Sequence, residues 1–299
     1  MKTMAFRQPR PAPVADSGAA AARAPEHSIG SIMRAARELT DAQVEQILIY
    51  QRTHDVRFGD AAMALQLASR ADVMWALSQQ FHYPYAPSGN FNPELAAAVD
   101  PFGAQAELFR GWRSQLLTGV LSPDKPRVAL AVISPDRGDG RTYFAANMAV
   151  AFSQLGDRTL LIDANLRAPR QHRLFGVEAA PGLSGILAGR AETDVIRQVK
   201  DLPSLYLLPA GAVPPNPTEL LQRSAFTLLI QDLLSQFDHV IVDTPAGAPT
   251  ADARLIAIKS GAAVTIARRN LSRVKPLRAL LDSLVPTATI VAGVLINER

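Results

Sequence analysis

The chain has 299 residues, a formal net charge of +4, 48% hydrophobic residues and no cysteine. This composition excludes disulfides and cysteine-ligated metals, and it suffices for a packed core in one large domain or two. No stretch approaches the ~18 apolar residues that span a bilayer, the N-terminus lacks the apolar core of a signal peptide, and basic residues are dispersed among acids, so we expect a cytoplasmic protein that binds no nucleic acid.

The N-terminal part of the chain predicts a tail, a small helical domain and a linker. Residues 1–25 are rich in proline, alanine and arginine without apolar periodicity, which predicts a disordered tail. Residues 26–82 contain an internal repeat that aligns Gly30 with Gly59 and Thr40 with Ser69. Each unit predicts two short helices, the second capped by Thr40 or Ser69. Residues 83–103 are interrupted by proline and glycine and predict a linker.

The repeat block resembles the N-terminal domain of type II secretion and pilus-assembly ATPases. Some of those domains bind a cyclic dinucleotide through tandem units that open with Arg-Leu-Gly. Here Arg57-Phe58-Gly59 approximates that opening, Ser28-Ile29-Gly30 lacks its arginine, and the second glycine of the pattern falls on Arg37 and Gln66. The resemblance leaves two roles open for the block, a cyclic-dinucleotide site or a docking or packing role.

Residues 104–117 predict a helix that carries Glu107, Arg110 and Arg113 close to one face. Such charges are usually solvated, but these stand immediately before a strand and a glycine-containing loop. We therefore expect them to present one carboxylate and two guanidinium groups together.

From residue 127 onward apolar runs alternate with helical patterns. The predicted strands are 127–133, 158–163, 204–208, 238–243, 261–267 and 289–296, and the predicted helices lie near 142–155, 192–199, 217–236, 249–258 and 274–284. The alternation predicts an α/β fold with a doubly wound, mainly parallel sheet. Such a sheet binds ligands at the carboxyl ends of its strands.

A glycine-containing loop joins the first of these strands to the next helix. It runs Ser134-Pro135-Asp136-Arg137-Gly138-Asp139-Gly140-Arg141-Thr142. In the phosphate-binding pattern G-x-x-x-x-G-K-[ST], glycines let backbone N–H groups approach an anion at a helix N-terminus. Gly140 and Thr142 are in register with that pattern, whereas Ser134 replaces its first glycine and Arg141 its lysine. The loop is therefore a degenerate phosphate site.

Two further predicted strands end in carboxylates, Asp163 and Asp243. An acid after a buried apolar run is costly to bury without a cation or hydrogen-bond donors. Each acid alone has a simpler reading as a helix cap or the partner of an arginine. Together with the Thr142 hydroxyl they match the oxygen ligands that Mg²⁺ prefers, so we predict a magnesium-nucleotide site where the three strands end.

Six segments, taken in order, resemble the cytoplasmic domain of the bacterial tyrosine kinases that serve capsule and exopolysaccharide export. They are 138–142, 161–169, 182–187, 208–211, 216–221 and 242–245, and the resemblance covers residues 104–299. The helical N-terminal domain and the short C-terminus look most like the chain-length-determinant-associated subgroup called EpsG. The resemblance implies a P-loop NTPase fold of the deviant Walker, MinD-like type, and an ATP- and Mg²⁺-dependent protein tyrosine kinase.

The resemblance also implies roles for individual residues. Nucleotide binding falls on Gly138, Asp139, Gly140, Arg141, Thr142 and Tyr143; metal binding on Thr142, Asp163 and Asp243; and catalysis on Arg141, on Asp163 as base, and on Arg167. Glu107, Arg110 and Arg113 match an element that joins subunits of the family into a ring, which implies a homo-oligomer. The implied partner is a membrane-bound polysaccharide co-polymerase, which would hold this chain at the inner membrane.

Three departures from the family keep a second hypothesis open. Arg141 is bulkier than lysine, Asn165 replaces the second acid of its motif, and the C-terminus carries no tyrosine cluster. The chain is then either a tyrosine kinase that acts on a partner or a nucleotide-binding pseudokinase that regulates the same machinery. A third reading, a partitioning or septum-site ATPase, requires a lysine where Asp136 stands.

Overall fold

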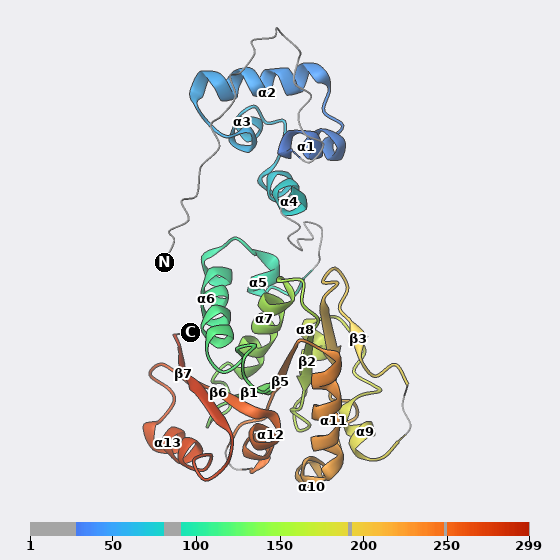
Figure 1. Cartoon of the computed structure of the whole chain (residues 1–299), viewed down its shortest axis with the longest axis vertical. Helices are drawn as coiled ribbons and strands as arrows, with labels where there is room; N and C mark the ends of the chain where they lie inside the picture. The colour runs from blue at the N-terminus through green and yellow to red at the C-terminus, as the bar shows by residue number, and fades with distance from the viewer. Residues whose placement is uncertain (1–27, 81–90, 191–192, 248–249, 299) are drawn as a thin grey trace, which may run out of the picture. The chain divides into compact units, whose positions relative to one another are not determined.

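The computed structural model describes residues 28–80, 91–190, 193–247 and 250–298 (Figure 1). The predicted tail, residues 1–25, lies outside the described residues, as does the first part of the predicted linker, residues 83–90. Contacts divide the chain into two units, Met1–Val73 and Met74–Arg299. Among the described helices none is long and apolar enough to cross a membrane.

The N-terminal repeat folds into two helix pairs, which confirms the expected small helical region. Thr40 accepts the backbone N–H of Gln43 while the Gln43 side chain accepts the N–H of Thr40, and Ser69 forms the same reciprocal pair with Asp72. These capping boxes satisfy backbone donors that the helix itself leaves unpaired. The helices are α1 (Ile29–Arg37), α2 (Asp41–His54), α3 (Phe58–Ala64) and α4 (Arg70–Gln80).

The second unit is built on a seven-stranded sheet. Its order is β3-β4-β2-β5-β1-β6-β7, and every pairing is parallel except that of β3 with β4. This topology confirms the doubly wound, mainly parallel prediction, and all six predicted strands are present. The strands are β1 (Ala129–Ile133), β2 (Thr159–Asp163), β3 (Arg197–Gln198), β4 (Leu205–Leu208), β5 (His239–Asp243), β6 (Gly261–Arg268) and β7 (Ile290–Asn297).

Helices cover both faces of the sheet. One buried cluster packs α5 (Ala96–Val99), α6 (Ala104–Thr118), α7 (Arg141–Ser153) and α8 (Gln171–Leu174) against one face. A second cluster packs α9 (Leu183–Leu187), α10 (Pro217–Gln222), α11 (Ser224–Gln236), α12 (Asp252–Ser260) and α13 (Val274–Asp282) against the other. Because every residue of β1 is buried, the loop that leaves it emerges from a fixed strand end.

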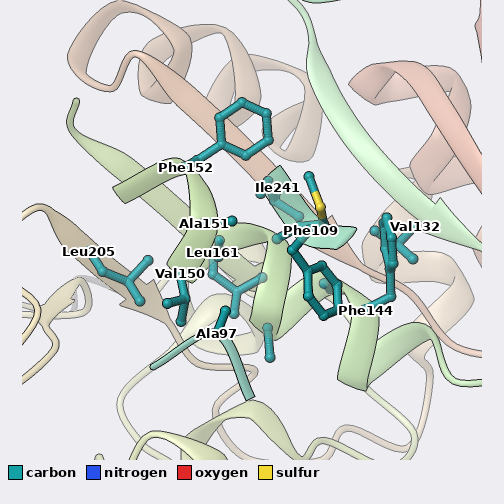
Figure 2. Close-up of a cluster of buried hydrophobic side chains, with 14 of the residues drawn as sticks. Ala97, Phe109, Val132, Phe144, Val150, Ala151, Phe152, Leu161, Leu205 and Ile241 are labelled. Atoms are coloured by element: carbon teal, nitrogen blue, oxygen red, sulfur yellow. The ribbon is translucent and has the colours of Figure 1, made fainter. Parts of the chain in front are cut away.

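Helix α7 lies at the centre of the first cluster. Figure 2 shows its residues Phe144, Val150 and Phe152 with Phe109 of α6 and Leu161 of β2. Alanines fill much of the rest of the helix and are buried, so α7 is apolar nearly all round and packs on several sides. The helix that begins at the end of the glycine-containing loop is therefore held rigidly.

The predicted helix near 192–199 is wrong. Arg197 and Gln198 form the short antiparallel strand β3, and the N–H of Val199 donates to the carbonyl of Leu205 at 2.8 Å. The spacing of Val195, Ile196 and Val199 imitates a helix, but the open edge of β4 pairs with Arg197 and Gln198 between them. The sequence pattern therefore located an apolar segment but assigned it to a helix instead of an edge strand.

Two other boundaries differ from expectation. The predicted helix 217–236 is divided into α10 and α11 at Arg223, whose backbone is extended at φ −57° and ψ 146°. The last part of the predicted linker packs on α7: the buried Asn147 side chain accepts the N–H of Ala97 at 2.9 Å and donates to the carbonyl of Glu94 at 2.8 Å. One buried amide therefore ties residues 91–99 to the sheet unit.

Candidate active site

The loop between β1 and α7 has the backbone of a phosphate cradle. Gly138 and Gly140 have φ values of 91° and 106°, a conformation that costs other residues free energy. Gly140 also stands directly before α7, and a Cβ there would come within 2.5 Å of the Asn297 side-chain nitrogen. The positive φ therefore favours glycine at 140, and a Cβ there would also require the Asn297 side chain to shift.

Asp139 holds the loop in shape. Its buried carboxylate accepts the N–H of Asp136 at 2.9 Å and the hydroxyl of Ser272 at 2.7 Å. The Asn297 side chain at the end of β7 donates to the Asp139 carbonyl at 3.0 Å. Asp139, predicted to bind nucleotide, thus has its carboxylate engaged inside the protein, where it links the loop to the segment that follows β6, while its backbone carbonyl links the loop to the end of β7.

Arg141 turns back into the loop. Its Nε donates to the Thr244 carbonyl at 3.1 Å, and its Nη1 donates to the Asp136 carbonyl at 2.6 Å and to the Ser134 hydroxyl. Burial lowers the pKa of the guanidinium, against the charges of Asp243, Asp139 and Asp136, which raise it. Nη2 makes no hydrogen bond with any described residue, so one edge of the guanidinium is left to meet an anion.

Asp163 and Asp243 end neighbouring parallel strands and are paired in register. Both side chains are fully buried. Asp163 accepts backbone N–H groups from Asn165 at 3.2 Å, Arg170 at 2.9 Å and Gln171 at 3.0 Å. Burial, followed by the charge of Asp243, nevertheless raises the pKa of Asp163 to about 7. A carboxyl with such a pKa can accept a proton near neutral pH.

Asp243 is the centre of the cluster. Its Oδ2 accepts the side-chain N–H of Gln171 at 2.9 Å, and its carboxylate also accepts the Thr142 hydroxyl. Burial raises its pKa to about 6 in spite of these bonds. Its Oδ1 is buried and has no hydrogen-bond partner among the described residues. Burying an unpaired carboxylate oxygen beside a second carboxylate costs free energy, and a bound cation would offset that cost.

Gln171 is a site residue that the sequence analysis missed. It is fully buried at the start of α8, and its side-chain nitrogen also donates to the Thr142 carbonyl at 3.1 Å. Its Oε1 has no partner among the described residues. A single glutamine in a polar segment gives no signal by itself, since its place depends on the turn that brings residues 170 and 171 back to Asp163.

The cluster fits a magnesium ion bound with a nucleotide. Among the described residues no three or more His, Cys, Asp or Glu side chains gather as a metal site. The oxygen donors at this point are the carboxylates of Asp163 and Asp243, the Thr142 hydroxyl and the side-chain carbonyl of Gln171. Mg²⁺ typically takes one or two carboxylates and completes its octahedron with water and phosphate oxygens, so this donor set suits it.

Two residues of the motif after β2, Asn165 and the predicted catalytic Arg167, are engaged elsewhere. Asn165 closes its own loop, since its Nδ2 donates to the Ala168 carbonyl at 2.9 Å and its Oδ1 accepts the Ala168 N–H at 3.1 Å. Arg167 donates to the buried Asp252 at 2.6 Å and to the Thr218 hydroxyl at 3.0 Å. These contacts tie the segment after β2 to α10 and α12 rather than to the phosphate loop.

Helix α6 borders the site on the side of β7. Its Arg110 pairs with Glu107 at 2.5 Å, and Arg113 donates to the carbonyl of Ala151 in α7. Tyr143, the residue after Thr142, donates to the Gln105 side chain at 3.2 Å. A cavity of about 450 Å³ opens beside Gly140 and is lined mainly by apolar and aromatic side chains, among them Phe109, Trp112, Tyr143, Leu295 and Ile296.

Comparison with known proteins finds similarity to a cellulose biosynthesis family and to bacterial tyrosine-protein kinases. Residues 129–274 match the protein family described as cellulose biosynthesis protein BcsQ. The putative tyrosine-protein kinase CapB of Staphylococcus aureus is 32% identical over 185 residues, which cover 60% of this chain and 80% of CapB. The solved kinase domain of the Escherichia coli tyrosine kinase ETK superposes with a TM-score of 0.64 at 28% identity, over 68% of this chain and 79% of that one.

A longer relative matches the same part of the chain. Tyrosine-protein kinase wzc of Salmonella typhimurium is 32% identical over 205 residues, which cover 69% of this chain. The matched segment is 28% of wzc, so the chain spans little more than a quarter of the length of this relative.

Proposed function

This chain belongs to the bacterial tyrosine kinase family, as its identity with CapB over most of that protein shows, and on that premise we propose that it is an ATP-dependent protein tyrosine kinase that regulates exopolysaccharide polymerisation and export. The observation that carries the proposal is the meeting of Thr142, at the start of α7, with Asp163 and Asp243, at the carboxyl ends of β2 and β5. In a parallel sheet that edge is the ligand-binding edge.

The transfer step assigns one role to each group. The acceptor tyrosine oxygen attacks the γ-phosphorus, the bond from that phosphorus to the β,γ-bridging oxygen breaks, and ADP leaves. Asp163 takes the proton of the tyrosine hydroxyl, which its raised pKa supports. Backbone N–H groups of residues 138–142 and the free edge of Arg141 would hold the β- and γ-phosphates.

A magnesium ion would be held by the Thr142 hydroxyl and Asp243, with Asp163 and the Gln171 carbonyl beside it. When bound, the ion neutralises charge on the phosphate oxygens. The unpaired Oδ1 of Asp243 and the two raised carboxyl pKa values support this assignment. Arg167, predicted to be catalytic, would act only indirectly, through its ion pair with Asp252.

The cavity beside Gly140 is our candidate for the adenine base. It lies on the β6 and β7 side of the loop, opposite the strands that carry the two acids, and its lining is mostly apolar and aromatic. Flat heteroaromatic rings bind such surfaces by stacking and apolar contact. An adenine base in this cavity would contact Tyr143, which the sequence predicts to bind nucleotide.

A kinase is preferred over a pseudokinase regulator of the same machinery. Both acids and Thr142 are in place, and the relatives that match over residues of this unit are named tyrosine-protein kinases. Arg141 keeps a positive charge at the loop although it is anchored by three hydrogen bonds. The acceptor tyrosine would be supplied by a partner.

The partner we propose is a membrane-bound polysaccharide co-polymerase, which would hold this cytoplasmic chain at the inner membrane.

Self-association through Glu107, Arg110 and Arg113 is a second part of the proposal. Sedimentation of the Arg110→Ala, Arg113→Ala double variant should move toward monomer, and an unchanged mass would reject that interface. The N-terminal helices keep their two proposed roles, docking or binding of a cyclic dinucleotide, with Arg57 as the first residue to substitute.

The activity is tested with labelled ATP and Mg²⁺, with and without the cytoplasmic tail of a co-polymerase. We expect phosphotyrosine to form with the wild-type chain. Asp163→Asn should form it at least about 100-fold more slowly, because the variant lacks the general base. ATP binding that raises the melting temperature without any transfer would identify the regulator instead.

A further inference from the structure

A second pocket opens beside the phosphate loop and carries an unusual number of basic side chains. It has a volume of about 450 Å³, and its lining includes Arg137, Arg170, His172 and Arg173. Pro169 and Val213 add apolar surface to the same pocket. Arg137 belongs to the phosphate loop itself, and the other three basic residues follow one another around the start of α8.

The pocket has too few acids to balance these charges. Arg170 pairs with Glu94, whereas Arg137 and Arg173 are exposed and form no ion pair with any described residue. His172 adds a buried Nδ1 that has no partner among the described residues. Guanidinium groups held together without carboxylates repel one another, and an incoming anion relieves that repulsion.

The position of the pocket indicates which anion it meets. The backbone N–H of Arg170 donates to Oδ2 of Asp163 at 2.9 Å, so one wall of the pocket is hydrogen-bonded to the proposed base. Arg137 is separated by one residue from Asp139, which braces the loop. A tyrosine hydroxyl that reaches Asp163 therefore arrives on a segment of chain that lies close to these basic side chains.

We propose that this pocket binds an acidic stretch of the acceptor polypeptide, next to the tyrosine that is phosphorylated. The inference rests on the proposed kinase function and deepens it, since it names the class of acceptor. Carboxylates complement the positive charges of Arg137 and Arg173, and the apolar lining accommodates the remainder of a peptide. A small anion would leave that apolar lining unused.

The test uses a fluorescent random copolymer of glutamate and tyrosine as the probe and the full chain without nucleotide. Anisotropy at low salt measures binding of the probe. Arg173→Glu should weaken it at least about tenfold, Arg173→Lys should keep it within about twofold, and rising salt should weaken it for the wild type. Arg278→Glu is the matched control: Arg278 is an exposed arginine of α13 that forms no ion pair with the described residues.

Phosphorylation of the same copolymer separates the two proposals. We expect Arg173→Glu to raise KM for the copolymer about tenfold with little change in kcat, and a copolymer of lysine and tyrosine to be a poor acceptor. Arg173-dependent binding without any phosphotyrosine would reject the kinase and keep the acidic-segment pocket. Phosphorylation with equal KM in wild type and Arg173→Glu, or equal anisotropy, would reject the pocket and keep the kinase.

Discussion

The side-chain nitrogen of Gln171 lies 2.9 Å from Oδ2 of Asp243, while the backbone nitrogen of the same glutamine lies 3.0 Å from Oδ2 of Asp163. One residue thus donates to both buried carboxylates. It bridges the two acids, which the register of β2 and β5 already places side by side. The short helix α8 therefore belongs to the site.

Replacement of Gln171 should destabilise the chain in a pH-dependent way. Gln171→Met keeps the volume and removes the hydrogen bond to Asp243, which should lower the free energy of unfolding by about 1–3 kcal/mol at pH 7.5. The loss should be smaller at pH 5, where Asp243 is protonated and the bond is no longer made to a charge. Urea denaturation at both pH values measures it.

Gln154→Met is a matched control for that measurement. Gln154 is buried in the same unit, and its side chain donates to the neutral carbonyl of Ala97 at 2.8 Å. Its substitution should cost about 1 kcal/mol, equally at pH 5 and pH 7.5. If Gln171→Met behaved in the same pH-independent way, Gln171 would not contact an ionised carboxylate.

The two raised carboxyl pKa values predict that the metal-free chain loses stability as pH rises. The folded pKa values of Asp163 and Asp243, about 7 and about 6, lie above the ordinary 3.8. The folded state therefore binds more protons than the unfolded state between pH 4 and pH 7. Each group contributes a slope of up to about 1.4 kcal/mol per pH unit in that window, with stability greatest at its acid end.

The Asp243→Asn variant isolates this effect from the other titrating groups. It removes one carboxyl and also removes the neighbouring charge that raises the pKa of Asp163. Thermal or urea unfolding without Mg²⁺ should show a flatter dependence on pH from 5 to 7.5 in this variant. Parallel profiles for the variant and the wild type would show that Asp243 has no raised pKa and that its charge does not raise the pKa of Asp163.

Arg141→Lys should strengthen binding of ATP. Arg141 spends Nε and Nη1 on three acceptors within the loop and beside it. A lysine carries the same charge on a slimmer stem and is free to approach the phosphates as a point charge. We expect affinity or turnover to rise several-fold, up to about tenfold, measured by calorimetry and by phosphate transfer. A loss on this change would show that the arginine is adapted to its place.

Trp112 should report occupation of the cavity beside Gly140. It lines that cavity, and the chain has one other tryptophan, Trp75, in α4. Binding of ATP should change the fluorescence of the Trp75→Phe variant, and it should leave Trp112→Phe silent. A response that is lost with Trp75 and kept without Trp112 would place the base elsewhere.

The sheet could be predicted from the sequence because its strands are buried on both faces. β1, β2 and β5 read as continuous apolar runs that end in a loop or an acid, and their carboxyl ends meet because parallel strands share a direction. That arrangement brought Thr142, Asp163 and Asp243 into one prediction. The sequence did not predict the antiparallel β3, because an edge strand of two residues has no periodic pattern of its own.

The rest of the site depends on contacts between distant segments. Gln171 reaches Asp243 only because the turn after β2 returns to the sheet, and Arg141 turns inward because carbonyls of Asp136 and Thr244 accept its N–H groups. No local period or motif spacing encodes such contacts. They arise from tertiary packing, which single-sequence patterns do not describe.

Calorimetric titration of the chain with ATP, with and without Mg²⁺, tests the central claim most directly. The convergence of Thr142, Asp163 and Asp243 predicts one site whose affinity falls at least about tenfold when Mg²⁺ is removed, and whose dependence on Mg²⁺ disappears in Thr142→Val. Equal affinity with and without Mg²⁺, or no binding of ATP at all, would contradict it.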